Sequence, residues 1–238
     1  MFQPLIGPPR LVALGGASAH EISHSMEAFR LGLRLGADGV QSDARLTADG
    51  VVTLCAEPTV GGRFRRRQIS ELNSAELPEG VSTLADLVQD IGPDSELVLS
   101  VANASTVTAV LGTLGDSGFD LGRLWLVSGD LELLEAHRKS GDGVRLVHSV
   151  RLAALNRGLE AHAATLRRLG IDGIWVPFDE LTAGHVALLH RFTRLVLAHG
   201  PQHVRQMEEV LGMGIDALGS GQVERMVDVA TDLGIRAR

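Results

Sequence analysis

Short apolar runs alternate with longer amphipathic stretches along the whole chain. The run RLVAL at residues 10–14 is apolar and bounded by glycine, which is typical of a buried strand. Residues 24–35 follow it, and Met26, Phe29 and Leu33 recur there at the spacing of one helical face. Strands that alternate with helices in this way predict an α/β fold with a parallel sheet.

The same alternation continues to the C-terminus. It predicts strands at residues 10–14, 38–43, 51–55, 96–101, 123–127, 144–148, 172–176, 194–198 and 215–219. It predicts helices at residues 24–35, 81–91, 105–115, 130–139, 157–169, 182–191, 202–212 and 222–233. The strand at 51–55 is interpreted as the hairpin partner of the strand before it.

Three joints between a helix and a strand share one sequence pattern. An apolar helix end is followed by a glycine suited to a left-handed cap, then by an aspartate and a strand, in LGADGV (35–40), LGIDGI (169–174) and MGIDAL (213–218). The recurrence indicates one structural device at these joints.

The number of strand–helix units predicts the architecture. Close to eight units fit in 238 residues, and an undecorated (β/α)₈ TIM barrel has roughly 250 residues. We therefore predict a single (β/α)₈ TIM barrel that occupies residues 1–238 as one domain. The alternative is an open doubly wound sheet. It requires a G-x-G-x-x-G after the first strand, and LGGASAHE (14–21) lacks that spacing.

Composition and charge narrow the class of protein. Hydrophobic residues make up 45% and charged residues 21%, and a net charge of −7 argues against nucleic-acid binding. The single cysteine, Cys55, excludes an intrachain disulfide and is typical of a reducing compartment. The start, MFQPLIGPPR, does not resemble a signal peptide, and no stretch is long enough to span a bilayer. These features predict a cytoplasmic protein without a membrane span.

In a TIM barrel the functional groups lie at the carboxyl ends of the strands. On the strand at 38–43, Gln41 and Asp43 are two residues apart, so their side chains point to the same side. A metal ion or a phosphate would be met here by two carboxylates, yet one of the pair is an amide. Gln41, Asp43 and Ser100, which follows the third strand, are therefore candidates for binding a ligand.

Several segments resemble the signatures of the glycerophosphodiester phosphodiesterase family. LGGASAHEISHSMEAF (14–29) matches the length of H-R-G-A-S-A…P-E-N-T-x-x-A-F and shares Gly-Ala-Ser-Ala and Ala-Phe with it. GADGVQSDARLTADG (36–50) follows G-A-D-x-x-E-x-D-V-x-x-T-x-D-G, and VSTLADLV (81–88) and GIDALGSGQVERM (214–226) resemble two later segments. The resemblance implies a metal-dependent (β/α)₈ barrel that cleaves glycerophosphodiesters to glycerol 3-phosphate and an alcohol.

The proton-transfer residues that the resemblance implies are missing from this chain. The family's two catalytic histidines correspond to Leu14 and Ala56, and the arginine and aspartate beside them correspond to Gly15 and Glu57. Leucine and alanine cannot move a proton, whereas phosphodiester cleavage needs proton transfer at the leaving oxygen. We therefore interpret these four as degenerate positions, with no catalytic residue of the family intact.

Most of the metal ligands that the resemblance implies are missing as well. The family's glutamates and a nearby lysine correspond to neutral residues, and only Asp43 keeps its carboxylate; the replacements are Ser23, Gln41, Ser100 and Ala102. A hard cation such as Ca²⁺ or Mg²⁺ requires several anionic oxygens. We therefore expect that the metal cofactor is lost and that Asp43 is its one remaining, weak candidate ligand.

Other side chains at the expected barrel mouth are candidates for binding a ligand. His24 replaces a pocket asparagine of the family; it could act as an acid or base near Asp43, or be a polar residue at a helix start. His148 and His199 lie at strand ends and could together replace the lost histidines, or each could be hydrogen-bonded there. Trp175 is expected either in the core below the mouth or as an apolar wall of the pocket.

An arginine-rich run, RFRRR (63–67), lies in the loop after the hairpin, and in the family that loop covers the pocket mouth. Arg65 and its neighbours could attract an anion such as a phosphate, because the guanidinium is well shaped for it. The alternative is a solvated loop that offsets an acidic surface.

These observations leave three functional hypotheses. The first is a barrel of this family with a degenerate, inactive site, which binds a small anionic or polyol-phosphate ligand or a partner. The second is a divergent phosphoric diester hydrolase of lipid metabolism that uses His24, Asp43, Glu57, His148 or His199. The third is a barrel that is purely structural or that forms homo-oligomers. We favour the first, because the losses fall on the chemical positions while the spacing of the scaffold is kept.

Overall fold

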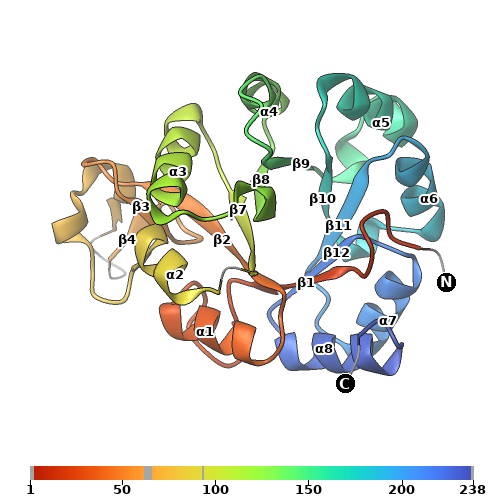
Figure 1. Cartoon of the computed structure of the whole chain (residues 1–238), viewed down its shortest axis with the longest axis horizontal. Helices are drawn as coiled ribbons and strands as arrows, with labels where there is room; N and C mark the ends of the chain where they lie inside the picture. Colours follow the sequence, from red (N-terminus) through yellow and green to blue (C-terminus); the bar gives the residue numbers. More distant parts are fainter. Residues whose placement is uncertain (1–2, 62–65, 93, 237–238) are drawn as a thin grey trace.

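The computed structural model describes residues 3–61, 66–92 and 94–236, and these fold into a closed parallel barrel (Figure 1). The strands of the barrel pair in the order β1-β12-β11-β10-β9-β8-β7-β2, and β1 also pairs with β2, which closes the ring. They are β1 (Arg10–Leu14), β2 (Gly39–Leu46), β7 (Glu96–Ser100), β8 (Leu124–Ser128), β9 (Arg145–Ser149), β10 (Gly173–Pro177), β11 (Leu195–His199) and β12 (Ala217–Ser220). The predicted (β/α)₈ barrel is confirmed.

The α-helices lie around the outside of the barrel (Figure 1). They are α1 (Met26–Arg34), α2 (Leu84–Asp90), α3 (Ala104–Ser117), α4 (Leu131–Arg138), α5 (Gly158–Leu169), α6 (Ala183–Arg191), α7 (Val204–Gly212) and α8 (Val223–Asp232). Their ends differ from the predicted ones by at most three residues. The largest difference is at α2, because Ser82–Thr83 form the short strand β6 instead of the first turn of the helix.

The chain leaves the barrel between β2 and α2. Ala44–Leu46, at the end of β2, pair antiparallel with β3 (Val52–Leu54), so β2 runs further than the predicted strand. Beyond β3, the strands β4 (Thr59–Val60) and β5 (Arg67–Gln68) form a separate antiparallel pair. We call residues 55–61 and 66–83 the excursion; it projects from the side of the barrel beside α2 and α3 (Figure 1).

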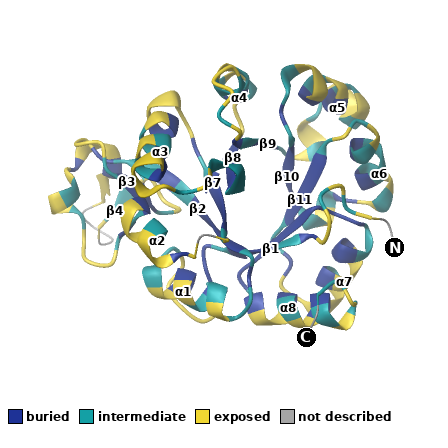
Figure 2. Ribbon diagram, viewed as in Figure 1, coloured by how far each residue is buried: buried dark blue, intermediate teal, exposed yellow. Residues whose placement is uncertain are grey.

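Two apolar cores hold the barrel together. The larger core packs the outer face of the strands against the helices and includes Phe29, Leu97 and Ile174. The smaller core contains Trp125 and Trp175, among others, from alternate positions of the same strands, so it fills the barrel interior. Figure 2 shows this division as buried strands inside a ring of helices with exposed outer faces. In the part of the chain that the structure describes, no helix is both long and apolar enough to cross a membrane.

The same kind of hydrogen bond forms at each of the three similar joints that were predicted from the sequence. Asp38, Asp172 and Asp216 each precede a strand, and the carboxylate of each accepts a hydrogen bond from the backbone N–H of the second residue of the neighbouring strand. The acceptor distances are 2.7 Å from Leu11 N to Asp38, 2.7 Å from Leu146 N to Asp172 and 2.8 Å from Val196 N to Asp216. A cationic or imidazole side chain also contacts each carboxylate, namely Arg236, Arg138 and His190. The aspartates therefore tie adjacent strands together at their amino ends.

Candidate functional site

A pocket of about 420 Å³ opens at the carboxyl ends of the barrel strands. We call it the mouth pocket. It brings together most of the residues that the sequence placed at the barrel mouth, and adds two serines, one from a loop and one from a strand end. Its lining is Leu14, Gly15, Ser18, Ser23, His24, Gln41, Asp43, Ser100, Ser149, Trp175 and His199.

The register of the sheet explains why Gln41 and Asp43 share this pocket with residues from other strands. Gln41 lies opposite Leu14 of β1, and Asp43 lies opposite Ser100 of β7. The parallel strands therefore end side by side, and alternate residues of each strand face the same interior. Gln41 is buried and Asp43 is half-buried at the pocket wall.

His24 is fixed by contacts on its backbone and on its ring. Its φ of 66° is in the left-handed region, which few residues other than glycine adopt. Its N–H donates to Gly15 O at 2.8 Å, and its carbonyl accepts from Ser82 Oγ at 2.8 Å. Its Nδ1 lies 2.7 Å from Ser42 Oγ, while the next residue, Ser25, caps α1. The ring is therefore held at the pocket wall in one orientation.

Burial lowers the pKa of His24 below its ordinary value of 6.5. The charge of Asp43 opposes this effect, and the charge of Arg45 adds to it. The imidazole is therefore mainly neutral at pH 7, and its free nitrogen can exchange a hydrogen bond or a proton with a ligand.

An aromatic stack forms another wall of the mouth pocket. The rings of Trp175 and His199 lie parallel, with centroids 5.0 Å apart and an interplanar angle of 13°. Both expectations for Trp175 hold, because its ring belongs to the interior core and also lines the pocket. Gly219 permits this packing, since a Cβ there would lie 2.8 Å from the Trp175 ring. Burial and, to a lesser degree, Arg151 lower the pKa of His199, whereas two nearby carboxylates raise it.

The expectation that His148 faces the mouth is wrong. His148 is buried on the outer side of β9, with Nδ1 3.1 Å from His162 Nε2 on α5 and Nε2 3.3 Å from Gly129 O. The strand runs one residue further than predicted, to Ser149, and it is Ser149 that lines the pocket. Successive side chains of a strand point to opposite faces. An error of one residue in the predicted strand end therefore assigns an outward side chain to the barrel interior.

Ala56 and Glu57 do not join the described site. Ala56 and Glu57 are exposed on the excursion, and neither lines the mouth pocket. The carbonyl of Ala56 instead accepts a hydrogen bond from Arg45 at 2.8 Å. Arg65 lies outside the described residues, and Arg67 forms an exposed ion pair with Glu76 at 3.1 Å.

Sequence reasoning missed Ser18 and Ser149 as pocket residues. Ser149 could have been found from alternation, since Val147 belongs to the interior core and Ser149 is two residues further along β9. Ser18 lies in the loop after β1, where its Oγ donates to Leu14 O at 3.1 Å. No periodic pattern marks a loop residue of this kind in advance.

The polar groups of the mouth pocket are mostly neutral. Its lining contains one carboxylate, Asp43, together with the Gln41 amide, two imidazoles and several serine hydroxyls. Across residues 3–61, 66–92 and 94–236, no three His, Cys, Asp or Glu side chains are grouped closely enough to hold a metal ion. Such a donor set suits hydrogen bonds to a polar ligand better than the coordination of a hard cation, which prefers several carboxylates.

Comparison with known proteins identifies a matching protein family, a relative with a similar segment, and solved structures of similar fold. Residues 15–224 match the model of the glycerophosphoryl diester phosphodiesterase family. A stretch of 46 residues is 52% identical to the protein named "Probable glycerophosphodiester phosphodiesterase 1" from Mycobacterium tuberculosis. That stretch covers 19% of this chain and only 17% of the relative's length.

Solved structures share the fold over nearly the whole chain. A glycerophosphodiester phosphodiesterase from Thermotoga maritima superposes with a TM-score of 0.80 at 20% identity, covering 93% of this chain and 98% of its own. A phosphodiesterase from Oleispira antarctica, in complex with the product sn-glycerol-3-phosphate, has a TM-score of 0.82 at 16% identity, covering 94% and 97% of the two chains. At these sequence identities the structural similarity establishes the barrel fold. What the site can do chemically follows from the side chains of this chain.

Proposed function

The chain belongs to the glycerophosphoryl diester phosphodiesterase family, and we propose that it is a member without diesterase activity whose mouth pocket binds a small polyol phosphate or similar anion. The chain keeps the fold of the family, whereas neutral side chains stand at most positions where the resemblance implies acidic or basic groups. The complex of the Oleispira antarctica relative with sn-glycerol-3-phosphate supports this class of ligand.

The lining of the mouth pocket is the observation that carries the proposal. Four of the positions at which the resemblance implies proton-transfer groups or carboxylates lie in one hollow, and there they are Leu14, Ser23, Gln41 and Ser100. Two others, Ala56 and Glu57, lie outside it. Convergence supports the residue-by-residue correspondence with the family, and the neutral side chains support the loss of hydrolysis. A divalent cation would find one carboxylate, Asp43, which is too few anionic oxygens for firm binding.

Restoring the missing carboxylates tests whether these positions form a former metal site. In the variant Ser23→Glu/Gln41→Glu/Ser100→Glu, three added carboxylates face Asp43 and repel one another without a cation, so the apo variant is less stable than the wild type. Ca²⁺ or Mg²⁺ then stabilises the folded variant, by about 2.7 kcal/mol at a hundredfold excess over Kd. Thermal melting measures this as a metal-dependent rise in Tm that the wild type does not show.

A variant of matched size controls for packing. Ser23→Gln/Ser100→Gln, with Gln41 retained, places side chains of the same length in the pocket without their charge. Its Tm is expected to be independent of Ca²⁺ and Mg²⁺. An equal metal response of both variants, or none in the glutamate variant, would show that the four positions do not converge as a metal site.

The competing function is a divergent hydrolase, and the presence of His24 and His199 in the same pocket as Asp43 is the observation in its favour. On our proposal the purified wild type does not hydrolyse glycerophosphocholine or glycerophosphoethanolamine with Ca²⁺, Mg²⁺ or Mn²⁺. The measurement is release of glycerol 3-phosphate. Turnover that disappears in Asp43→Ala would instead establish the hydrolase.

A further inference from the structure

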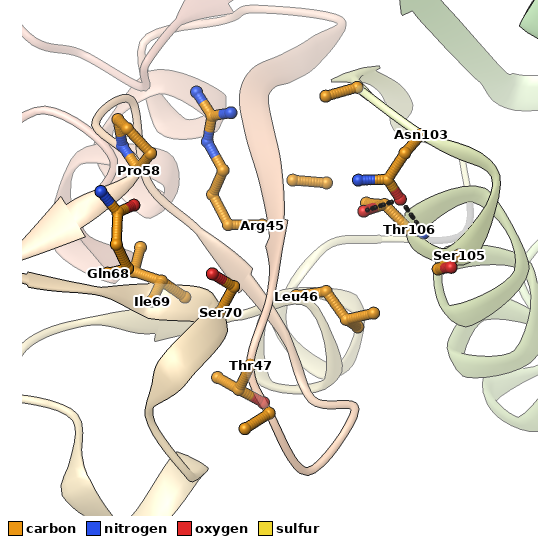
Figure 3. Close-up of a pocket in the computed structure, with 13 residues that line it drawn as sticks. Arg45, Leu46, Thr47, Pro58, Gln68, Ile69, Ser70, Asn103, Ser105 and Thr106 are labelled. Carbon is orange, nitrogen blue, oxygen red and sulfur yellow. Dashed lines mark hydrogen bonds between the residues drawn. The ribbon is translucent and has the colours of Figure 1, made fainter.

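A second hollow, of about 430 Å³, lies outside the mouth pocket (Figure 3). We call it the outer pocket. It is bounded by the far end of β2, the start of α3 and the excursion. Its polar lining consists of Arg45, Thr47, Gln68, Ser70, Asn103 and Ser105, with Thr106 behind. No carboxylate lines it among the described residues.

The outer pocket and the mouth pocket each share lining residues with a third hollow. This hollow has a volume of about 210 Å³. It shares Asp43, Ser100 and Ser149 with the mouth pocket, and it shares Arg45 and Ala102 with the outer pocket. The two pockets therefore lie close together near the carboxyl end of β2.

Arg45 is the cation of the outer pocket, and its position is fixed. Its Nη2 donates to Ala56 O at 2.8 Å and its Nε donates to Cys55 O at 3.4 Å. No carboxylate lies within ion-pair distance of it in the described part of the chain, and the residue is half-buried. A guanidinium that is held in place without a carboxylate partner is prepared to receive an oxyanion, because less conformational freedom is lost on binding.

Asn103 presents a hydrogen-bond donor to the same hollow. Its Oδ1 accepts from Thr106 N at 2.9 Å and from Thr106 Oγ1 at 3.0 Å, so this oxygen is already occupied. The amide nitrogen therefore points away from α3, and Figure 3 shows it on the side of Arg45. Across the hollow, Gln68 and Ser70 add further groups that can donate.

We propose that the outer pocket is an oxyanion-binding site, in which Arg45 is the anchoring cation and Asn103 is the second donor. The ligand is a small molecule that carries a phosphate or a carboxylate. This inference rests on the contacts of the outer pocket alone, so it does not require that the mouth pocket has lost its activity.

Titration of the whole protein with inorganic phosphate and, separately, with succinate tests the proposal. Chemical shifts of backbone amides give both the location and the Kd of each anion. Phosphate or succinate is expected to shift the amides of residues 68–70 and 103–106, and salt is expected to weaken binding. The tighter of the two anions identifies the ligand class. If neither anion shifts these amides, the proposal is wrong.

Two variants act on different donors of the outer pocket. Arg45→Gln removes the anchoring charge and is expected to weaken binding about tenfold or more. Asn103→Asp keeps a good N-cap for α3 but replaces the donor with a carboxylate, so binding is expected to be lost while Tm stays near that of the wild type. The control is Arg205→Gln, an exposed arginine on α7, which is expected to keep the wild-type Kd.

The outcomes separate this inference from the proposed function. Equal Kd values in Arg45→Gln, Asn103→Asp and Arg205→Gln would overturn the oxyanion site, whatever the mouth pocket does. Anion binding that depends on Arg45 would stand even if the restored carboxylates failed to bind a cation, because the probes contain neither metal nor glycerol.

Discussion

Replacing Asp216 with alanine lowers the free energy of unfolding by about 3–5 kcal/mol. The Asp216 side chain is fully buried and accepts from Val196 N at 2.8 Å and from Leu5 N at 2.6 Å. His190 Nε2 also lies 2.9 Å from its Oδ2. Alanine leaves these groups without the carboxylate, and at Val196 N, whose hydrogen bond is buried, water cannot replace it. Urea unfolding at pH 7 measures the loss.

Two further variants show whether the loss comes from these contacts. Asp216→Asn keeps one acceptor oxygen and is expected to lose about half as much stability. Asp90→Ala removes a carboxylate that pairs with Arg30 at 2.6 Å on the surface, and it is expected to cost about 1 kcal/mol or less. If Asp216→Ala were no less stable than Asp90→Ala, the aspartates at the joints would not be what ties the strands together.

Acidification destabilises the protein through the buried pair His148 and His162. Gly129 O lies 3.3 Å from His148 Nε2, so that nitrogen carries the hydrogen and His148 Nδ1 accepts from His162 Nε2 at 3.1 Å. Burial lowers the pKa of both imidazoles below 6.5, so both are mainly neutral at pH 7 in the folded protein. Burial and, to a lesser degree, His148 lower the pKa of His162 to about 4.

The sign of the effect follows from proton uptake. An unfolded histidine has a pKa of 6.5, so between pH 6.5 and pH 4 the unfolded chain binds a proton that the folded pair does not. Stability is present above pH 6.5 and falls as the pH is lowered, at about 1.4 kcal/mol per pH unit for one proton. His162 alone therefore removes about 3 kcal/mol between pH 7 and pH 4. Urea unfolding across this range measures the slope.

A variant isolates the contribution of His162. His162→Gln removes the titratable group. The free energy of unfolding of this variant is therefore expected to change less steeply with pH, by the amount that the uptake of about one proton contributes. His24, His148 and His199, whose pKa values burial also lowers, keep the remaining slope. His20→Gln removes an exposed imidazole as a control. An unchanged slope in His162→Gln would mean that this pair accepts protons as readily folded as unfolded.

Local patterns in the sequence were sufficient for the architecture and for much of the mouth pocket. Apolar periods and the glycine–aspartate joints indicated the barrel strands, β3 and the α-helices to within three residues, but not the short strands β4, β5 and β6. Once a parallel barrel is assumed, the last inward residue of each strand faces the mouth, and this placed Gln41, Asp43, Ser100 and His199 correctly in one pocket. Strand and helix periods are properties of neighbouring residues, which is why the chain alone reveals them.

Contacts between distant segments were decided only by the tertiary structure. The side of β9 on which His148 lies depends on where that strand ends, and the periodicity left this uncertain by one residue. His24 reaches the pocket because a left-handed residue turns the loop, and Arg45 lines two hollows because the carbonyls of the excursion hold it. Asp216 is joined to residues 20 and 211 positions away. Such pairings follow from how the strands close and how loops pack over them, because the free energy that selects them is gained only when the whole barrel has formed.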